Sequence, residues 1–442
     1  MPTIEEVFPT AGTPKYTYQP RLELEQKVDR YAKHGSGLLS VFGPTKAGKS
    51  VLVRRLMPTA LYVRGDVLTE AELWNIASTR LGTYTGRSKG KKQSTSWILG
   101  ITARISAGWV ALTGRAETTA MTGFESGQSA SDDTKTVVLA ALAKAKQAII
   151  IDDFHFMPRA EQKKVMAAVK GFIDDGHRAV IITAEHRAHQ VGSLIGNMAG
   201  RITPAPVPSW ETDDLEKIAV TGFKELKIAD PTRLASILAE NSFGSPQLMQ
   251  RLCQALCRAN DILETQTTRT TIQPPQPSWE AFYRDMLSRV DPEMRWVSKL
   301  TRGPLRHGTQ RNTYPTTNYG LLDGYGLVVL AIAQLLPSME LKRAAIQDKV
   351  AELIAAPRSP RNTETASKLQ YLSDLAGEPL DEAPAIEGDS TGRDKDGLES
   401  DPVLEYEESG ATSVLRLVDP LFAFALKWGD NPLLPQVPVA DV

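Results

Sequence analysis

The sequence predicts an α/β protein that begins with a helix-covered parallel sheet, continues into a helical unit and ends in a mixed unit. Three observations predict this fold. Short apolar runs alternate with stretches of helical periodicity, a glycine-bearing loop of fixed spacing follows the first clear apolar run, and a later apolar run ends in two carboxylates. Strands that alternate with helices of this length favour a parallel sheet with both faces covered.

Composition limits the classes of protein to which the chain can belong. Its 442 residues include 51 Lys+Arg and 52 Asp+Glu, so no overall charge surplus attracts nucleic acid or an anionic membrane. The two cysteines, Cys253 and Cys257, exclude a disulfide framework and a Cys/His zinc site. The opening residues lack the segments of a signal peptide, and no apolar run approaches the ~20 residues that span a bilayer. We expect a soluble, cytoplasmic protein without membrane contact.

The predicted sheet unit covers residues 21–210 and follows a Pro/Thr-rich segment, residues 1–20, that we expect to be extended. Short apolar runs indicate strands, and longer stretches with apolar residues at helical spacing indicate helices. The expected strands are 37–43, 60–63, 148–151 and 179–183. The expected helices are 21–34, the second part of 44–56, 70–81, 134–146 and 159–175.

Residues 84–134 interrupt this alternation. They begin with a basic cluster, Arg87, Lys89, Lys91 and Lys92, and then become rich in Gly, Ser, Thr and Ala. Residues 101–112 alternate loosely between apolar and polar positions. We expect an insertion in the sheet unit that contains a β-hairpin.

The second half of the chain reads as mainly helical. Residues 211–264 predict a helical lid, and the Thr/Gln/Pro-rich residues 265–278 predict a linker. Residues 279–430 contain helical candidates at 279–300, 326–335, 339–355 and 363–376, then short strands at 403–407 and 414–418. The segment 378–408 holds 12 acidic against two basic residues, and 431–442 forms a tail.

The strongest motif occupies residues 43–50. It matches G-x-x-x-x-G-K-[ST] between an expected strand and an expected helix, which is the context that the motif requires. The backbone N–H groups of such a turn wrap phosphates, and the helix N-terminus adds its positive end. We expect Lys49 to reach the β/γ-phosphates and the Ser50 hydroxyl to ligate Mg²⁺. The expected phosphate contacts are Gly43, Pro44, Thr45, Lys46, Ala47, Gly48, Lys49 and Ser50.

Polar side chains end two later strands. Asp152 and Asp153 follow an apolar strand, and we expect Asp152 to hold the magnesium shell. Asp153 stands where hydrolysing enzymes with such a loop usually carry Glu to polarise the attacking water. Because Asp is one methylene shorter, hydrolysis is slow or Asp153 acts through a second water. Thr183 ends another strand and either bonds the γ-phosphate or its water or simply ends that strand.

The order of these features resembles AAA+ ATPases, in the branch shared by Orc/Cdc6-type initiators and STAND signalling ATPases. The resemblance covers residues 16–260 and, more loosely, 320–428. It implies ATP with Mg²⁺ as ligands. It also implies that Tyr18 and Arg21, in a Y-x-x-R segment, pack near adenine, that Thr183 is the sensor-1 residue, and that Arg201 reaches a neighbouring subunit's γ-phosphate.

The lid carries a further element of the resemblance. Gly244-Ser-Pro246 resembles the G-x-P motif whose proline contacts the base. The next residue is Gln247, where initiator-type relatives commonly carry the sensor-2 arginine. The resemblance therefore does not imply that the lid is coupled to the phosphates in this protein.

The C-terminal part resembles a winged helix, with an Asp-Pro and an aromatic helix at its end, as in archaeal-type STAND ATPases. Its third helix contributes only Lys368, and its strand region is acidic, which disfavours contact with a nucleic-acid backbone. A protein-contacting or autoinhibitory role is therefore favoured.

Two main functions fit this sequence. The first is a slowly hydrolysing ATPase switch that forms a homo-oligomeric ring or filament with ATP and controls a separate effector protein. The resemblance implies bacterial anti-phage defence as its setting. The second is a DNA-loading AAA+ protein of the initiator or transposition-regulator kind, in which Arg87, Lys89, Lys91 and Lys92 face DNA. A weaker third hypothesis is that residues 101–112 form a hairpin that lines a pore or pairs between subunits.

Overall fold

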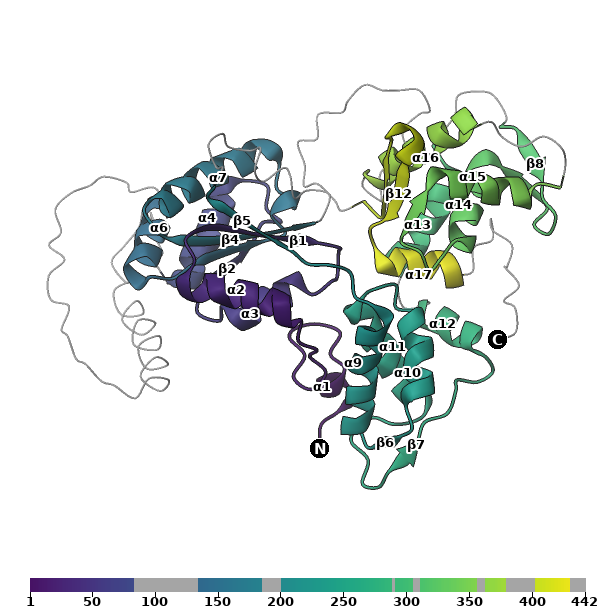
Figure 1. Cartoon of the computed structure of the whole chain (residues 1–442), viewed down its shortest axis with the longest axis horizontal. Helices are drawn as coiled ribbons and strands as arrows, with labels where there is room; N and C mark the ends of the chain where they lie inside the picture. Colours follow the sequence, from purple (N-terminus) through teal and green to yellow (C-terminus); the bar gives the residue numbers. More distant parts are fainter. Residues whose placement is uncertain are drawn as a thin grey trace, which may run out of the picture.

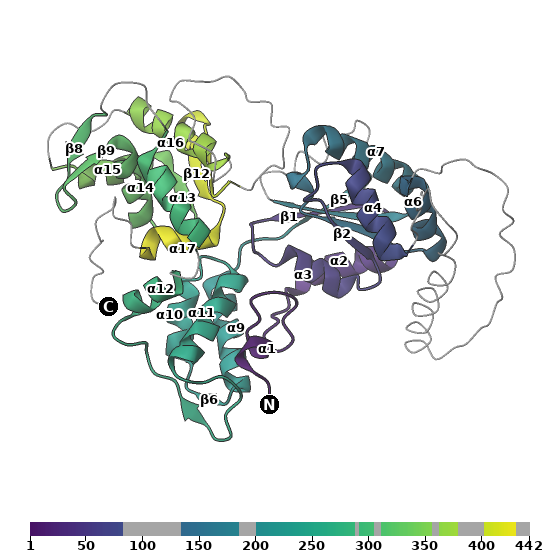
Figure 2. The same ribbon diagram turned by 180° about the vertical axis from the view of Figure 1, so that it is seen from behind.

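The computed structural model describes residues 1–82, 134–184, 200–287, 291–304, 311–355, 362–378 and 402–429. These residues form a sheet unit, a helical lid that carries the N-terminal segment, and a C-terminal unit that meets the lid (Figure 1). The same arrangement is seen from behind in Figure 2.

A five-stranded parallel sheet organises the first unit, in the order β2-β3-β4-β1-β5. β4 therefore lies between β1, which leads into the phosphate loop, and β3, which ends at the first of the two carboxylates. The strands are β1 (Gly37–Gly43), β2 (Leu61–Arg64), β3 (Ile149–Asp152), β4 (Arg178–Ala184) and β5 (Ile202–Pro206).

Helices cover both faces of this sheet because alternate strand residues point to opposite sides. Leu38 and Ile149 pack under one group of helices, whereas their neighbours Leu39 and Ile150 pack under the other. The first face carries α4 (Glu70–Leu81), α6 (Thr134–Ala145) and α7 (Arg159–Asp174); the second carries α2 (Leu22–His34) and α3 (Lys49–Leu56) (Figure 1). The α/β class predicted from the sequence is confirmed.

One strand of the sheet is missing from the sequence prediction. β5 reads Ile-Thr-Pro-Ala-Pro, and its two prolines argue against a strand. It lies at the edge of the sheet and pairs only with β1, where proline is tolerated because one side of the strand needs no hydrogen-bond donors. The expected insertion lies almost wholly outside the described residues.

The N-terminal segment packs against the lid. It contains a one-turn helix, α1 (Ile4–Val7), that begins at a capping box between Thr3 and Glu6. The expectation of a wholly extended segment missed this turn. The lid itself consists of α9 (Thr212–Glu225), α10 (Thr232–Glu240) and α11 (Pro246–Ala259). Residues 265–278 lie along the lid, where β7 (Thr270–Thr271) pairs with β6 (Ile228–Ala229).

The C-terminal unit combines helices with short strands. The expected helix at 279–300 is two helices, and the one expected at 339–355 begins with a strand, β10, because Glu340–Lys342 pairs with β12. Its sheet has the order β10-β12-β11. The elements are α12 (Trp279–Leu287), α13 (Asp291–Arg302), β8 (Thr313–Pro315), β9 (Leu321–Asp323), α14 (Gly324–Gln334), β10 (Glu340–Lys342), α15 (Arg343–Leu353), α16 (Asn362–Ala376), β11 (Leu404–Glu407), the 3-10 turn η3 (Gly410–Thr412), β12 (Val414–Leu417) and α17 (Pro420–Trp428).

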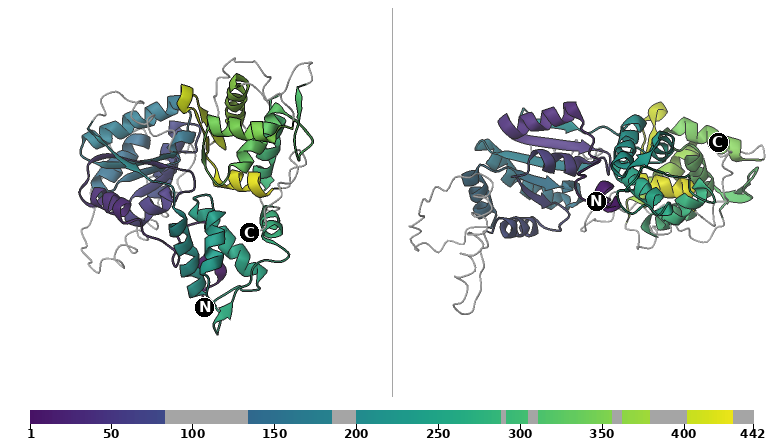
Figure 3. Two further views of the ribbon diagram at one scale, coloured as in Figure 1. Left: turned by 45° about the vertical axis from the view of Figure 1, so that its right-hand side comes forward. Right: turned by 90° about the horizontal axis from the view of Figure 1, so that it is seen from below.

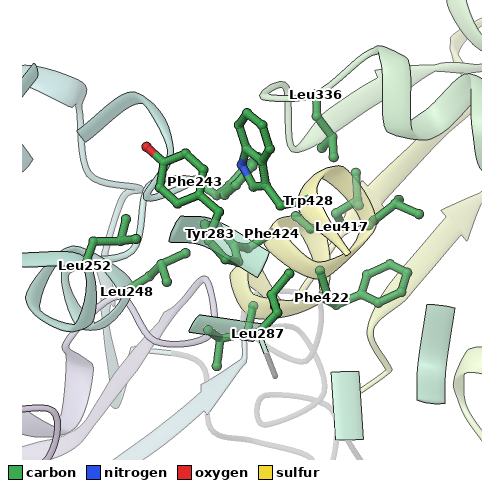
Figure 4. Close-up of a cluster of buried hydrophobic side chains, with 14 of the residues drawn as sticks. Phe243, Leu248, Leu252, Tyr283, Leu287, Leu336, Leu417, Phe422, Phe424 and Trp428 are labelled. Carbon is green, nitrogen blue, oxygen red and sulfur yellow. The ribbon is translucent and has the colours of Figure 1, made fainter. Parts of the chain in front are cut away.

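An aromatic cluster joins the lid to the C-terminal unit (Figure 4). Tyr283 of α12 stands edge-on to Phe424 of α17, with ring centroids 5.4 Å apart, and packs against Trp428 at 4.7 Å. Phe243, between α10 and α11, meets Phe424 at 6.3 Å. These residues belong to one buried cluster that extends through the lid and the C-terminal unit. Figure 3 shows the lid in contact with this unit from two further directions.

Within the part of the chain that the structure describes, no helix has both the length and the apolar character needed to cross a membrane.

Candidate nucleotide site

A cavity of about 330 Å³ lies between the sheet unit and the lid. The phosphate loop forms its floor, the N-terminal segment and Trp210 form one wall, and the start of α11 forms another. Ten of the predicted site residues line this cavity, although they come from positions between Tyr18 and Pro246 of the chain. A cavity of this volume has the size of a small-molecule site.

The local conformation of the phosphate loop explains its glycines. Gly48 begins α3 with φ +88°, in the left-handed region that glycine adopts without strain. At Gly43, a Cβ atom would lie 2.2 Å from the carbonyl oxygen of Val207, so only glycine fits beside β5's continuation. A glycine-bearing turn before a helix of this kind offers backbone N–H groups to an anion.

Lys49 and Ser50 open α3 at the cavity. The Lys49 ammonium donates to the carbonyl oxygens of Gly43 and Pro44, at 2.9 Å and 2.8 Å. Carbonyl groups are neutral acceptors, so a phosphate can replace them as the partner of this cation. Ser50 is half-buried in the cavity wall. Ser50 is the second residue of α3, and it is the residue predicted to bind Mg²⁺.

The two acids after β3 occupy different environments. Asp152 is buried; its carboxylate accepts the backbone N–H of Asp153 at 3.0 Å and the hydroxyl of Tyr62. Burial and this carboxylate raise the pKa of Tyr62 above its ordinary value. Asp153 lines the cavity and adopts a left-handed backbone, φ 56°. Its carboxylate lies 3.8 Å from the guanidinium of Arg64, which also pairs with Asp66 at 2.7 Å.

These groups fit a magnesium ion held together with a nucleotide. Magnesium usually takes one or two protein oxygens and fills its other positions with phosphates and waters. Ser50 supplies a hydroxyl oxygen, and the Asp152 carboxylate already accepts hydrogen bonds, as it would from metal-bound water. Thr183 is the second-last residue of β4, beside Phe42 of β1, and its buried hydroxyl oxygen has no hydrogen-bond partner among the described residues.

The wall next to the phosphate loop is built from the predicted Y-x-x-R segment and a tryptophan that the sequence reasoning missed. The Tyr18 hydroxyl donates to Glu25 at 2.6 Å, while Arg21 donates to the carbonyl oxygens of Pro208 and Ser209. The Arg21 guanidinium lies 4.9 Å from the Trp210 ring centroid. Burial raises the pKa of Tyr18 and lowers that of Arg21.

Trp210 also fixes the phosphate loop. Its indole N–H donates to the carbonyl oxygen of Ala47 at 2.9 Å. No motif marks this residue, because its role depends on a contact across 163 positions of sequence. It closes the cavity beside the loop with a flat aromatic face.

The lid reaches the cavity through the start of α11. Gly244 takes φ +69°, Ser245 caps the helix by accepting the N–H of Leu248 at 3.2 Å, and Pro246 is the first helical residue. Pro246 and Gln247 line the cavity, whereas Gly244 supplies the turn that brings them there. Gln247 donates to the carbonyl oxygen of Thr10 at 3.0 Å.

Arg201 is not part of this cavity. It precedes β5 and forms an ion pair with Asp174 at the end of α7. β1 and β5 run parallel, and the Arg201 carbonyl bonds the N–H of Leu38 near the start of β1, so Arg201 lies at the sheet end opposite the phosphate loop. Its side chain is about half exposed. Arg87, Lys89, Lys91 and Lys92 lie outside the described residues.

A contact with the C-terminal unit completes the site. Lys46, inside the phosphate loop, pairs with both carboxylate oxygens of Asp419, at 2.6 Å and 2.7 Å. Asp419 also caps α17 by accepting the N–H of Leu421 at 2.8 Å. At the other end of α17, the Trp428 indole and the Lys427 ammonium donate to Asn241 of the lid, each at 3.2 Å. The helix therefore bridges the loop and the lid over a length of about 13 Å.

The sheet order, the phosphate loop at the end of β1 and the acid pair at the end of β3 are those of a P-loop NTPase fold. No known family model matches the sequence. A search of curated proteins finds no match either.

Solved structures with similar architecture cover most of the chain. The Walker-type ATPase paby2304 of Pyrococcus abyssi is 12% identical with a TM-score of 0.49, over 95% of this chain and 99% of that one. The ORC2 protein of Aeropyrum pernix, in its ADP form, is 14% identical with a TM-score of 0.44, over 96% and 95%. A STAND protein of Pyrococcus horikoshii with a tetratricopeptide repeat sensor is 16% identical with a TM-score of 0.32, over 66% and 37%.

Proposed function

We propose that this protein is an ATP-binding and ATP-hydrolysing switch whose phosphate site controls the position of its C-terminal unit. The observation that carries this proposal is the ion pair between Lys46 and Asp419. A bound triphosphate brings about four negative charges to the loop, so it attracts Lys46 and repels Asp419. Because α17 also touches the lid, release at the loop would free the helix at one end and loosen its contact at the other.

The residues divide the chemistry between them. Lys49 and the loop N–H groups would hold the phosphates, and Ser50 with Asp152 would hold an Mg²⁺ ion, which would neutralise phosphate charge. Asp153 orients and deprotonates the attacking water, while Thr183 bonds the γ-phosphate or that water. Arg201 of a neighbouring subunit stabilises the charge that develops during hydrolysis.

The C-terminal unit is the output of this switch. We propose that it is a winged helix, which the order α14-β10-α15-α16-β11-β12 supports. Its strand region contains Glu340 and Glu407, which bind Arg416. We propose that the freed unit allows ATP-dependent assembly of subunits and contacts a separate effector protein. We propose bacterial anti-phage defence as its setting, as the sequence resemblance implies.

An Asp419→Asn variant tests the switch. Asparagine caps a helix about as well as aspartate, so the variant removes the charge that binds Lys46 and keeps α17. We expect it to assemble at roughly tenfold lower concentration of a slowly hydrolysed ATP analogue than the wild type does. The reason is that the variant loses the ion pair that holds the C-terminal unit at the phosphate loop. Mass measured by light scattering, with no nucleotide, ADP–Mg²⁺ or the analogue, gives the result.

Asp323→Asn is the matched control. Asp323 also caps a helix, α14, and also pairs with an arginine, Arg311 at 2.9 Å, but this pair lies within the C-terminal unit. The Asp323→Asn substitution should leave unchanged the concentration of ATP analogue at which half of the protein is assembled. Equal midpoints for Asp419→Asn and the wild type would contradict the switch. Assembly that needs added duplex DNA would favour the DNA-loading function instead.

A further inference from the structure

Helix α11 turns three glutamines toward the N-terminal segment. Gln247, Gln250 and Gln254 are spaced three and four residues apart, so they share one face of the helix. Their amide nitrogens donate to the carbonyl oxygen of Thr10 at 3.0 Å, the hydroxyl oxygen of Thr17 at 2.8 Å and the carbonyl oxygen of Phe8 at 3.4 Å. Gln247 and Gln250 line the nucleotide cavity, whereas Gln254 lies one turn beyond it.

Thr17 decides which way the Gln250 amide faces. The Thr17 hydroxyl has one proton, which it donates to the carbonyl oxygen of Val7 at 2.9 Å, and a carbonyl can only accept. The Thr17 oxygen must therefore accept from Gln250, which places the amide nitrogen of Gln250 toward Thr17. The amide oxygen, Oε1, is left facing away. Both side chains are more than nine-tenths buried, so water does not compete for these bonds.

The Gln250 Oε1 atom is a buried acceptor that receives no hydrogen bond from any residue in the described part of the chain. Buried polar atoms in native proteins almost always have a partner, so such an atom in a cavity wall indicates a ligand group. Pro246, four residues before Gln250 and so one turn away on α11, lines the same cavity. The ligand group that meets Oε1 must be a donor.

We propose that Gln250 Oε1 accepts a hydrogen bond from the exocyclic amino group of adenine and thereby makes the site selective for adenine nucleotides. This rests on the nucleotide binding proposed above. Adenine carries an N–H donor at C6, whereas guanine and hypoxanthine carry an oxygen acceptor there. Two acceptors that face each other leave both atoms unpaired, and a buried site rejects such a ligand strongly.

Competition between nucleotides tests the assignment on the full chain. The experiment measures how well three nucleotides displace a ribose-labelled fluorescent ATP. The competitors are ATP, ITP, which has an oxygen at C6, and purine riboside triphosphate, which has only hydrogen at C6. We expect the wild type to bind ATP about 10-fold more tightly than purine riboside triphosphate and about 100-fold more tightly than ITP. In Gln250→Met, which keeps the length and loses the acceptor, these ratios should fall to within about threefold.

Gln254→Met is the matched control. It removes the same kind of side chain and a similar bond to the N-terminal segment, one turn away from the cavity. The nucleotide ratios of the wild type should persist in this variant. A drop in Gln250→Met alone therefore reports the contact with the base rather than a loosened segment.

Thr17→Val provides a second, independent variant. Valine keeps the shape of threonine and removes the oxygen that holds the Gln250 nitrogen, so the amide can turn and donate to an oxygen at C6. ITP should then bind more tightly than it does to the wild type, while ATP binds more weakly. General loosening of the site would weaken both.

The outcomes separate this inference from the proposed function. Equal affinity of the wild type for ATP and ITP, or full ATP preference in Gln250→Met and Thr17→Val, overturns the role of Gln250 and leaves the nucleotide site intact. Failure of the wild type to bind the fluorescent ATP overturns the site itself. If Gln250→Met does not fold, Thr17→Val decides the matter.

Discussion

Asp153 has a left-handed backbone conformation, and its carboxylate lies near an arginine. A non-glycine residue in the left-handed region costs of order 1 kcal/mol and is kept where the surroundings require it. Here that conformation places the carboxylate at the cavity, 3.8 Å from Arg64. Arg64, the last residue of β2, brings its positive charge beside this carboxylate. The geometry suits a base that acts on a water molecule in the cavity.

Replacing this carboxylate tests its role. We expect Asp153→Asn to lower ATP turnover at least about 100-fold, because the amide cannot take a proton, while ATP affinity changes little. Phosphate release measures turnover, and displacement of fluorescent ATP measures binding. Asp66→Asn removes the other carboxylate that pairs with Arg64, and it should retain turnover. Unchanged turnover in Asp153→Asn would show that another group activates the water.

Helix α11 serves the lid core and the cavity with different faces. Its buried apolar face contains Leu252 and Leu256 as well as both cysteines, whereas its glutamine face holds the N-terminal segment. One helix therefore couples lid stability to the cavity wall. Any motion that opens the lid must carry Pro246 and Gln250 with it.

The cysteines report the integrity of this helix. Burial raises the pKa of Cys257 to about 12, and the pKa of Cys253 is raised well above its ordinary value for the same reason. The thiols should therefore resist alkylation by iodoacetamide at pH 8 in the native protein and react fast after unfolding in urea. The unfolded thiols ionise near pH 9, whereas the folded Cys257 ionises only near pH 12. The contribution of the buried thiols to the free energy of unfolding should therefore fall as the pH rises from about 9 to about 12. Rapid alkylation of the native protein would show that the lid opens freely.

The whole molecule is held together by contacts between units. In the aromatic cluster, Phe243 of the lid meets Phe424 of α17, which packs with Tyr283 of α12 (Figure 4). The Asp419 end of α17 reaches the phosphate loop. The charge of a nucleotide does not affect apolar packing, but it does affect an ion pair at the phosphate loop. The lid and the C-terminal unit therefore share a core, while their contact with the loop can change with the ligand.

Truncating the cluster tests this shared core. Phe424→Ala should cost about 3–5 kcal/mol of unfolding free energy, because the ring is fully buried against two other rings. Urea unfolding followed by tryptophan fluorescence gives the value. Leu321→Ala, at a position that is 69% exposed, should change it by less than about 0.5 kcal/mol. A loss below about 1 kcal/mol for Phe424→Ala would show that the two units are stabilised separately.

The sequence could predict those parts of the fold that depend on near neighbours. The helix Glu70–Leu81 has its expected bounds, because a threonine cap and a following glycine mark its ends. β5 was missed because its prolines suit only an edge position, and edge positions are set by the whole sheet. β10 was missed because three residues become a strand only when β12 lies beside them.

The same distinction applies to the site. By itself the sequence predicted the phosphate loop, the acid pair at the end of β3 and the Gly244-Ser-Pro246 motif of the lid, since each is a run of consecutive residues whose backbone conformation sets its chemistry. Only the tertiary structure decided that Lys46 pairs with Asp419, 373 residues away, and that Thr17 orients Gln250, 233 residues away. Such pairs depend on how separate elements pack, and packing energy is shared among many buried contacts rather than encoded in any short stretch of chain.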